Sequence, residues 1–265
     1  MQLTFPSAPG ADKPIAIVTG ASRRQGIGAA ICRLLAESGV SIFFTGWSAF
    51  DASIETGIDA DGPDALLHEI LDLGVTGGWE EVDLADPEAP AAIFNAAESV
   101  LGPVSILVNN AAHSTSDSWQ TLDAAMLDAH YQVNLRATAL MTVEFARRWS
   151  GGPGGRVVSL TSGQFKGPML GEIAYASTKG AIDAFTITMA AELATHGITV
   201  NAVGPGPTDT GWMTDEIKEA LLPKHPLGRF GMPADIAKLV AFLVSEQGEW
   251  VTGQIIHSEG GFIRR

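Results

Sequence analysis

The feature that most constrains the fold is an alternation of short apolar runs with longer helical patterns, which continues from residue 14 to residue 257. The runs predicted as strands are Pro14–Thr19, Ser41–Thr45, Thr76–Val82, Val104–Val108, Arg156–Leu160, Ile198–Val203 and Gln254–His257. The stretches predicted as helices are Ile27–Ser38, Asp64–Leu73, Pro87–Leu101, Leu122–Trp149, Tyr175–Thr195 and Pro233–Ser245. Strands that are apolar on both faces and separated by helices indicate a parallel sheet that is covered on both sides.

This unbroken alternation predicts a single α/β domain over residues 1–265. We expect a doubly wound, seven-stranded parallel sheet with strand order 3-2-1-4-5-6-7 and helices on both faces. In this order, the connection after the third strand returns the chain to the other side of the first strand. The crevice that results is a site for a ligand.

Two connections are longer than this architecture requires. Gly46–Gly62 is acidic and stands where a short loop is expected, and Pro205–Met232 carries Trp212 and Met213 between the sixth strand and the last long helix. Loops of this length in a compact domain are usually functional or mobile. We therefore predict that residues 205–232 form a lid over the substrate.

The charge balance excludes several classes of partner. Lys and Arg number 16 and Asp and Glu number 30, which gives a formal charge of −14 and argues against nucleic acid or an anionic membrane as a partner. The single cysteine, Cys32, excludes an internal disulfide framework, and we predict that it lies in the core. No His, Asp and Glu set has metal-ligand spacing, and neither a signal peptide nor a membrane-spanning run is predicted. We expect a cytoplasmic globular protein.

A glycine-rich segment, Thr19–Gly39, follows the first strand and opens the first helix. A turn of this kind lets backbone N–H groups and the helix N-terminus face a pyrophosphate. Gly20 would allow the tight turn, Gly26 the close approach of the phosphates, and Gly28 the packing of helix on strand. The same glycines are also typical of an ordinary tight turn, so the interpretation depends on the motifs that follow.

Further motifs follow in order along the chain: Asp83 after the third strand, Asn109–Ala112 (NNAA) after the fourth, Asn134 in YQVNL, Ser162, Tyr175–Lys179 (YASTK), Asn201–Gly206 (NAVGPG) and Pro226–Glu246. In these motifs nearly the whole chain resembles the short-chain dehydrogenase/reductase family, close to the 3-oxoacyl-acyl-carrier-protein reductases. The resemblance implies a Rossmann-type sheet and a nicotinamide cofactor. The chain departs from the family pattern by two extra residues within Ser22–Gln25 and by Ala112 in place of a glycine.

Four residues are the candidate catalytic set. Tyr175 would give a proton to the alkoxide that forms when a carbonyl accepts hydride, but a free phenol has a pKa of ~10. Lys179 lies about one helical turn further on, so its charge would favour the phenolate. Ser162 would hydrogen-bond the carbonyl oxygen, where negative charge develops. The resemblance implies that Asn134 holds a water that links Lys179 to solvent.

The resemblance also implies which residues hold the cofactor: Gly20, Ser22, Arg23, Arg24, Gly26, Ile27, Gly28, Asp83, Leu84, Asn110, Ala111, Tyr175, Lys179, Pro205, Gly206, Thr208 and Thr210. Among these, Asp83 would contact the adenine amino group, and Thr208 and Thr210 the nicotinamide carboxamide. His113 and His130 match no motif and are interpreted as ordinary polar residues.

The choice between NADP and NAD depends on the end of the second strand. Gly46 stands where NAD-preferring members carry an acid that holds the ribose hydroxyls, whereas Arg23 and Arg24 could meet a 2′-phosphate. Against this, the acids that follow would repel that phosphate if folded over it: Asp51, Glu55, Asp59 and Asp61. The sequence favours NADP and leaves NAD open.

Three functions remain possible. The first is reduction of a ketone or 3-oxoacyl substrate, and the second is oxidation of a sugar, steroid or other secondary alcohol. The third, a dinucleotide-binding sensor without turnover, is disfavoured because binding alone needs no Tyr175 proton donor. An enoyl reductase of the same superfamily would have a longer Tyr–Lys spacing. The substrate is expected to be a small carbonyl or alcohol compound.

The two long helices carry more apolar side chains than one sheet face covers: Leu140, Met141 and Phe145 on the first, and Ile182, Phe185, Met189 and Leu193 on the second. In the family that the chain resembles, the matching helices pair across a two-fold axis. We therefore expect a homo-oligomer, a tetramer with D2 symmetry. The alternative is that these side chains face the sheet of their own subunit.

Overall fold

The computed structural model describes residues 2–53, 59 and 61–264. The strands in this part of the chain are β1 (Ile15–Val18), β2 (Ser41–Gly46), β3 (Gly77–Glu81), β4 (Ile106–Asn109), β5 (Gly155–Leu160), β6 (Ile198–Gly204) and β7 (Ile255–His257). The α-helices are α1 (Ile27–Glu37), α2 (Ser48–Ser53), α3 (Gly62–Asp72), α4 (Ala89–Val100), α5 (Ala124–His130), α6 (Thr138–Arg148), α7 (Ile173–Ala194), α8 (Asp215–Leu221) and α9 (Pro233–Val244). A π-helical segment, η1 (Tyr131–Ala137), joins α5 to α6, and η2 (Leu222–Lys224) and η3 (Glu246–Gly248) are 3-10 turns.

The strands form one seven-stranded sheet in the order β3-β2-β1-β4-β5-β6-β7, and every pairing is parallel. Strand β1 pairs through Ile17 with Phe43 of β2 on one side and with Leu107 of β4 on the other. The chain therefore leaves the β3 edge and crosses to the far side of β1 to enter β4. This arrangement confirms the predicted fold class and strand order.

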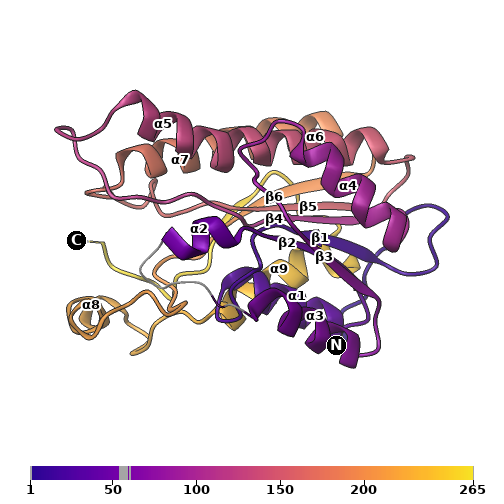
Figure 1. The fold of residues 1–265 in the computed structure, drawn as a ribbon, viewed down its shortest axis with the longest axis horizontal. Coiled ribbons are helices and arrows are strands. Elements are labelled where there is room, and N and C mark those ends of the chain that lie inside the picture. Colours follow the sequence, from indigo (N-terminus) through magenta and orange to yellow (C-terminus); the bar gives the residue numbers. More distant parts are fainter. Residues whose placement is uncertain (1, 54–58, 60, 265) are drawn as a thin grey trace.

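Helices cover both faces of the sheet: α4, α5, α6 and α7 lie on one face, and α1, α3 and α9 on the other (Figure 1). The central strands are buried on both faces, as the apolar runs predict. On β1, Ala16 and Val18 belong to the core under α1 and α9, whereas Ile15 and Ile17 belong to the core under α4 and α6. Each large apolar side chain buried in this way contributes about 1.5–3 kcal/mol.

Two elements differ from the sequence prediction. The helix predicted over Leu122–Trp149 starts at Ala124 and contains the π-helical segment η1, a distortion that hydrophobic periodicity does not reveal. The acidic connection Gly46–Gly62, predicted as a loop, contains α2. Cys32 is buried on α1, as predicted.

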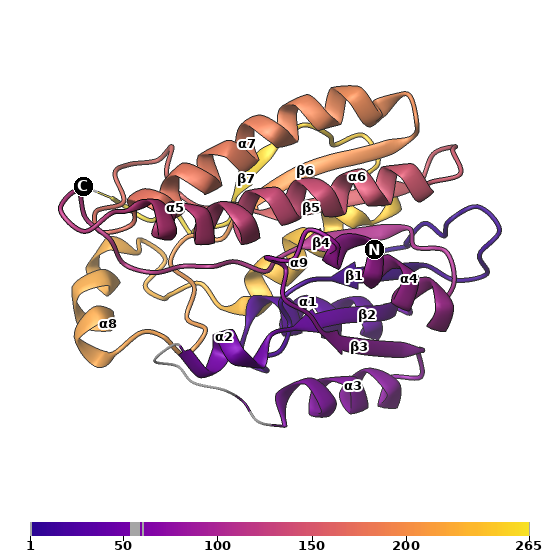
Figure 2. The ribbon, with the colours of Figure 1, turned by 45° about the horizontal axis from the view of Figure 1, so that its top comes forward.

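The carboxyl ends of the strands meet on the side of the molecule where α2, α8 and the C-terminus gather (Figure 2). Most candidate site residues lie at this edge because they follow a strand or lie in the first turns of the helix after it, whereas Asn134 lies in η1, between α5 and α6. Within the described ranges, no helix has both the length and the apolar character that a bilayer crossing needs.

Candidate active site

The first turn of α7 is held by a buried carboxylate from a distant loop. Asp117 is 5% exposed and accepts hydrogen bonds from the backbone N–H of Ile173 (2.6 Å) and Ala174 (2.8 Å). These donors have no partner inside the helix, so Asp117 serves as its cap. Tyr175 follows directly, and its ring centroid lies 5.5 Å from the Lys179 Nζ one turn later. The sequence-predicted pair therefore shares one face of the helix.

Lys179 is buried behind Tyr175. It is 2% exposed, and its Nζ donates a hydrogen bond to the carbonyl oxygen of Leu160 at the end of β5 (2.7 Å). Burial lowers the pKa of Lys179 to about 8, and the negative charge of Asp183 acts in the opposite direction. The ammonium is therefore largely charged at pH 7.

The Tyr175 phenol is protonated at neutral pH. Burial raises its pKa to about 12, the nearby charge of Glu172 raises it further, and a hydrogen bond with Ser162 lowers it. A proton donor for a developing alkoxide must carry its proton before the reaction starts. Tyr175 meets this condition, as a phenol with the ordinary pKa of about 10 also would. The raised pKa makes it a weaker donor, and the shift is opposite to the one that the sequence predicts from the charge of Lys179.

Ser162 and Tyr175 line the same cavity, which has a volume of about 840 Å³. Apolar side chains form a large part of its wall: Pro168, Met169, Leu170, Pro207, Trp212, Leu221 and Phe262. Three charged residues, Glu172, Lys224 and Arg264, also line it. A cavity with an apolar wall and a few polar groups beside a proton donor is suited to a small organic substrate.

Asn134 lies in the π-helical segment η1 and is fully buried. Its Nδ2 donates to the His113 carbonyl oxygen (2.9 Å) and to Thr178 Oγ1 (3.0 Å), and its Oδ1 accepts from the His113 N–H (2.7 Å). π-Helical turns are frequent at functional sites because they displace one side chain from the regular helix. Asn134 thereby joins η1, α7 and the segment after β4, and its predicted role in holding a water stays a prediction.

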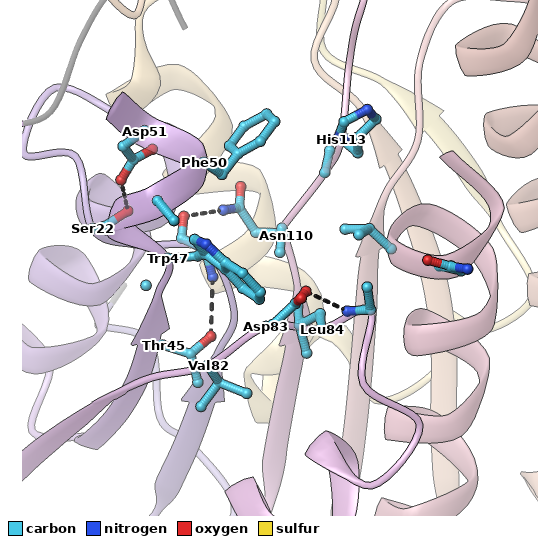
Figure 3. A pocket seen from close by; sticks show the side chains of 18 of the residues that line it. Ser22, Thr45, Trp47, Phe50, Asp51, Val82, Asp83, Leu84, Asn110 and His113 are labelled. Atoms are coloured by element: carbon cyan, nitrogen blue, oxygen red, sulfur yellow. Dashed lines mark hydrogen bonds between the residues drawn. The ribbon is translucent and has the colours of Figure 1, made fainter. Parts of the chain in front are cut away.

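The predicted phosphate loop forms one wall of a second cavity, of about 510 Å³ (Figure 3). Gly20 has φ +70°, and a Cβ atom there would lie 2.6 Å from Ala111 Cα, so only glycine fits. Asn110 Nδ2 donates to the Thr19 and Gly20 carbonyl oxygens (2.9 and 2.7 Å). Among the described residues, no side chain caps the N-terminus of α1 at Gly26, which leaves its first N–H groups for an anion. These features fit a dinucleotide.

We call this second cavity the dinucleotide groove. Only some of the residues predicted to hold the cofactor line it. The predicted residues that line it are Gly20, Ser22, Asp83, Leu84, Asn110 and Ala111. Gly206 and Thr210 line the Tyr175 cavity instead, and the Thr208 hydroxyl donates to the Pro205 carbonyl oxygen (3.1 Å). Gly28 packs α1 against the turn, since a Cβ there would lie 2.6 Å from the Gly20 oxygen; Ile27 is the first residue of α1.

The two arginines do not line the groove. Arg23 Nη2 donates to the Thr210 carbonyl oxygen (2.7 Å), and Arg24 pairs with Glu69. Arg24 and Gly26 line a different cavity, between α1 and α9. The positions of Arg23 and Arg24 therefore do not support the sequence argument that they meet a 2′-phosphate.

The acidic connection after β2 folds over the groove in part. Gly46 ends β2, as predicted, and Asp51 on α2 accepts a hydrogen bond from Ser22 Oγ (2.5 Å). Asp59 Oδ2 accepts from the Arg24 N–H (3.3 Å), and Asp61 precedes α3. Glu55 lies outside the described residues.

Sequence analysis missed several residues of both cavities. Trp47, Phe50 and His113 line the dinucleotide groove, and the Phe50 and His113 rings lie 5.4 Å apart at its rim (Figure 3). His113 directly follows the NNAA motif, a position that could have marked it. Glu172 and Arg264 line the substrate cavity; Glu172 stands three residues before Tyr175, whereas nothing in the sequence places Arg264 there.

Comparisons with known proteins agree with this geometry. A family model described as enoyl-(acyl carrier protein) reductase matches residues 20–263. An uncharacterized oxidoreductase of Bacillus subtilis, YjdA, is 54% identical over 94% of this chain and 97% of its own.

Two further curated relatives have more specific names. An NADPH-dependent aldehyde reductase-like protein of Arabidopsis thaliana is 37% identical over 94% of both chains. The 3-oxoacyl-[acyl-carrier-protein] reductase FabG of Aquifex aeolicus is 33% identical over 93% of this chain and 96% of its own. Among solved structures, a short chain dehydrogenase of Burkholderia cenocepacia in complex with NADP has a TM-score of 0.84 at 33% identity, covering 95% of this chain and 98% of its own.

Proposed function

The chain belongs to the short-chain dehydrogenase/reductase family, and we propose that it reduces a small carbonyl compound with NADPH. It is an enzyme that acts on CH–OH or C=O groups with a nicotinamide cofactor. The direction of the reaction, the substrate and the choice of NADP form the proposal.

The observation that carries the proposal is the state of Tyr175. Its pKa is raised to about 12, it lines the substrate cavity with Ser162, and the charged Lys179 lies 5.5 Å from its ring centroid. A protonated phenol is ready to donate, as reduction requires. Oxidation would instead require the phenolate, which burial and the charge of Glu172 disfavour.

The bound nicotinamide would supply the hydride for the carbonyl carbon. Ser162 would donate a hydrogen bond to the carbonyl oxygen and stabilise the charge that develops there. Tyr175 would give its proton to that oxygen, and the positive charge of Lys179 would stabilise the phenolate left behind. The apolar wall of the cavity would keep water from the reacting groups.

The lining of the cavity supports a carbonyl attached to an apolar body. Met169, Trp212 and Phe262 line the same cavity as the Ser162 hydroxyl and the Tyr175 phenol and offer apolar surface there. A 3-oxoacyl compound and an aldehyde both match this description, and relatives at 33% and 37% identity carry names of each kind. We propose a 3-oxoacyl or related ketone. Tyr175 and Lys179 are four residues apart, whereas an enoyl reductase of the same superfamily would have a longer Tyr–Lys spacing.

The proposal of NADP rests on relatives. One curated relative is named as NADPH-dependent, and one structural neighbour holds NADP. The side chains of Arg23 and Arg24 add no support, since both are engaged outside the groove. NAD remains the alternative cofactor.

Oxidation of a sugar, steroid or other secondary alcohol remains the second candidate reaction. The groups that would bind the alcohol, Ser162 and Tyr175, are the same, and only the ionisation of Tyr175 separates the two directions.

The cytoplasmic location expected from the sequence also stays a prediction.

A panel of carbonyl and alcohol compounds tests the proposal, with 3-oxoacyl thioesters, ketones, aldehydes, sugars and steroid alcohols followed through nicotinamide absorbance. We expect carbonyl reduction near neutral pH with NADPH, and a kcat about 10²–10⁴-fold lower in Tyr175→Phe. Turnover of alcohols alone would support the second candidate. Dinucleotide binding without turnover of any compound would support a sensor.

A further inference from the structure

The acidic connection after β2 places one carboxylate inside the dinucleotide groove. Helix α2 follows the end of β2 directly, and Asp51 on it is 7% exposed and lines the groove. Ser22 Oγ, in the turn that follows β1, donates a hydrogen bond to Asp51 Oδ2 (2.5 Å; Figure 3). A buried carboxylate with one hydroxyl donor keeps acceptor capacity for a further hydroxyl.

Two glycines fix the Ser22 turn that holds Asp51. A Cβ at Gly46, the last residue of β2, would lie 2.7 Å from Ser22 Cβ. A Cβ at Gly62, the first residue of α3, would lie 2.3 Å from the Ser22 carbonyl oxygen. The end of β2 and the start of α3 therefore both press against the turn, and Asp51 meets a hydroxyl whose position the packing determines.

Asp51 lies where a dinucleotide site commonly has an acid that binds the adenosine ribose. In doubly wound folds, an acid beyond the second strand hydrogen-bonds the 2′-hydroxyl of the adenosine ribose. Here β2 ends at Gly46, which has no side chain, and the next acid along the chain, Asp51, reaches the groove from α2. The helix thus supplies the carboxylate that the strand lacks.

We propose that Asp51 sets the selectivity of this groove between NAD and NADP, because its carboxylate accepts a hydrogen bond from a free ribose 2′-hydroxyl and repels a 2′-phosphate. This inference rests on the proposed use of a nicotinamide dinucleotide. The inference concerns only the contribution of Asp51, which favours NAD over NADP. It therefore holds whether the unaltered enzyme as a whole binds NAD or NADP more tightly.

The charges around Asp51 support this direction. Glu81, at the end of β3, adds a second negative charge near Asp51. The positive charge of Arg23 also acts on Asp51, and the Arg23 Nη2 donates a hydrogen bond to the Thr210 carbonyl oxygen. A 2′-phosphate bound beside Asp51 would therefore lie near the negative charges of Asp51 and Glu81, and repulsion is strong where burial reduces screening.

The test is the binding of NAD⁺ and NADP⁺, measured by isothermal titration calorimetry without any substrate. The variants are Asp51→Asn, which keeps the shape and removes the charge, and Asp51→Glu, which keeps the charge. Asp72→Asn, at the exposed end of α3, is the matched control for net charge. We expect Asp51→Asn to shift the ratio of the two dissociation constants by about tenfold or more toward NADP⁺. Asp51→Glu and Asp72→Asn should leave the ratio within about threefold of the unaltered protein.

The outcomes separate this inference from the proposed function. An unchanged ratio in a folded Asp51→Asn protein, or a shift toward NAD⁺, overturns the role of Asp51. Failure of the unaltered protein to bind either dinucleotide overturns the proposed function instead. If Asp51→Asn does not fold, Asp51→Ser, which also removes the charge, takes its place under the same criteria.

Discussion

Tyr175 and Lys179 have pKa values displaced in opposite directions, and this pair predicts how the activity depends on pH. The pKa of Lys179 falls from its ordinary 10.5 to about 8, so the ammonium loses its charge as the pH rises through that value. The phenolate that Tyr175 leaves after proton transfer then loses its stabilising charge. We expect kcat for carbonyl reduction to be flat between pH 6 and about pH 7, and to fall to about half near pH 8.

Asp183 provides the control for that assignment. It is 2% exposed, accepts a hydrogen bond from Gln164 Nε2 (2.6 Å), and its charge raises the pKa of Lys179. Asp183→Asn should therefore move the fall in kcat to lower pH. If kcat of this variant falls at the same pH as kcat of the unaltered enzyme, the fall is caused by a group other than Lys179.

Tyr175→Phe tests the proton donor itself. The substitution keeps the ring against Lys179 and removes only the hydroxyl, so dinucleotide binding should change little. We expect kcat to drop by at least about 10²–10⁴-fold, the usual contribution of general acid catalysis. Steady-state kinetics and a dinucleotide titration on the same preparation separate the two effects. If Tyr175→Phe kept most of the activity, Tyr175 would be excluded as the proton donor.

At the scale of elements, the cap of α7 links stability to catalysis. Asp117 holds the Ile173 and Ala174 N–H groups directly before Tyr175. Asp117→Ala should lower the free energy of unfolding by about 0.5–2 kcal/mol and should also lower kcat, because the first turn of α7 loses its anchor. Urea unfolding and kinetics measure the two effects.

Asp123 is the matched control, since its carboxylate caps a different helix, α5, by accepting the Met126 N–H (2.8 Å). Asp123→Ala should lower stability by a similar amount and leave kcat nearly unchanged. Equal losses of kcat in both variants would show that general stability, and not the anchoring of Tyr175, is responsible.

The elements also show where sequence reasoning succeeds. The strands and the helices on both faces were predictable because apolar runs and helical periodicity repeat along the chain, and Ser162, Tyr175 and Lys179 stand in motifs beside them. The π-helical turn around Asn134 has no periodic signal. Asp51 was visible as an acid, but its contact with Ser22 depends on how α2 folds back, which no local pattern specifies.

The segment Pro205–Met232 was predicted to be a lid that orders on binding, and its contacts define the test. It contains the helix α8, and the Ile263 N–H donates to the Lys224 carbonyl oxygen (2.9 Å), which ties the segment to the C-terminal tail. We expect hydrogen exchange in residues 208–228 to slow when NADPH and substrate bind, because closure protects backbone N–H groups. Equal exchange in both states would identify the segment as a fixed scaffold.

At the scale of the whole molecule, the expected assembly needs a correction in its supporting residues. Met141, Phe145, Ile182 and Leu193 are buried within their own subunit, so they cannot form an interface between subunits. The residues that remain are Leu140, Phe185 and Met189, which are half-buried, and Ile187 on α7 is 56% exposed.

The single-domain organisation also stays a prediction, which one cooperative unfolding transition would support.

The remaining apolar surface still predicts a homo-oligomer, because α6 and α7 present it side by side on one face, and the tetramer that the family resemblance implies stays a prediction. Each chain carries a formal charge of −14, so association must overcome repulsion and should strengthen with salt. We expect light scattering at micromolar concentration to give about four times the 27.7 kDa of one chain. Ile187→Asp should reduce that mass without lowering the stability of the subunit, because Ile187 is exposed in the single chain. A monomer mass for the unaltered protein at both low and high salt would exclude the assembly.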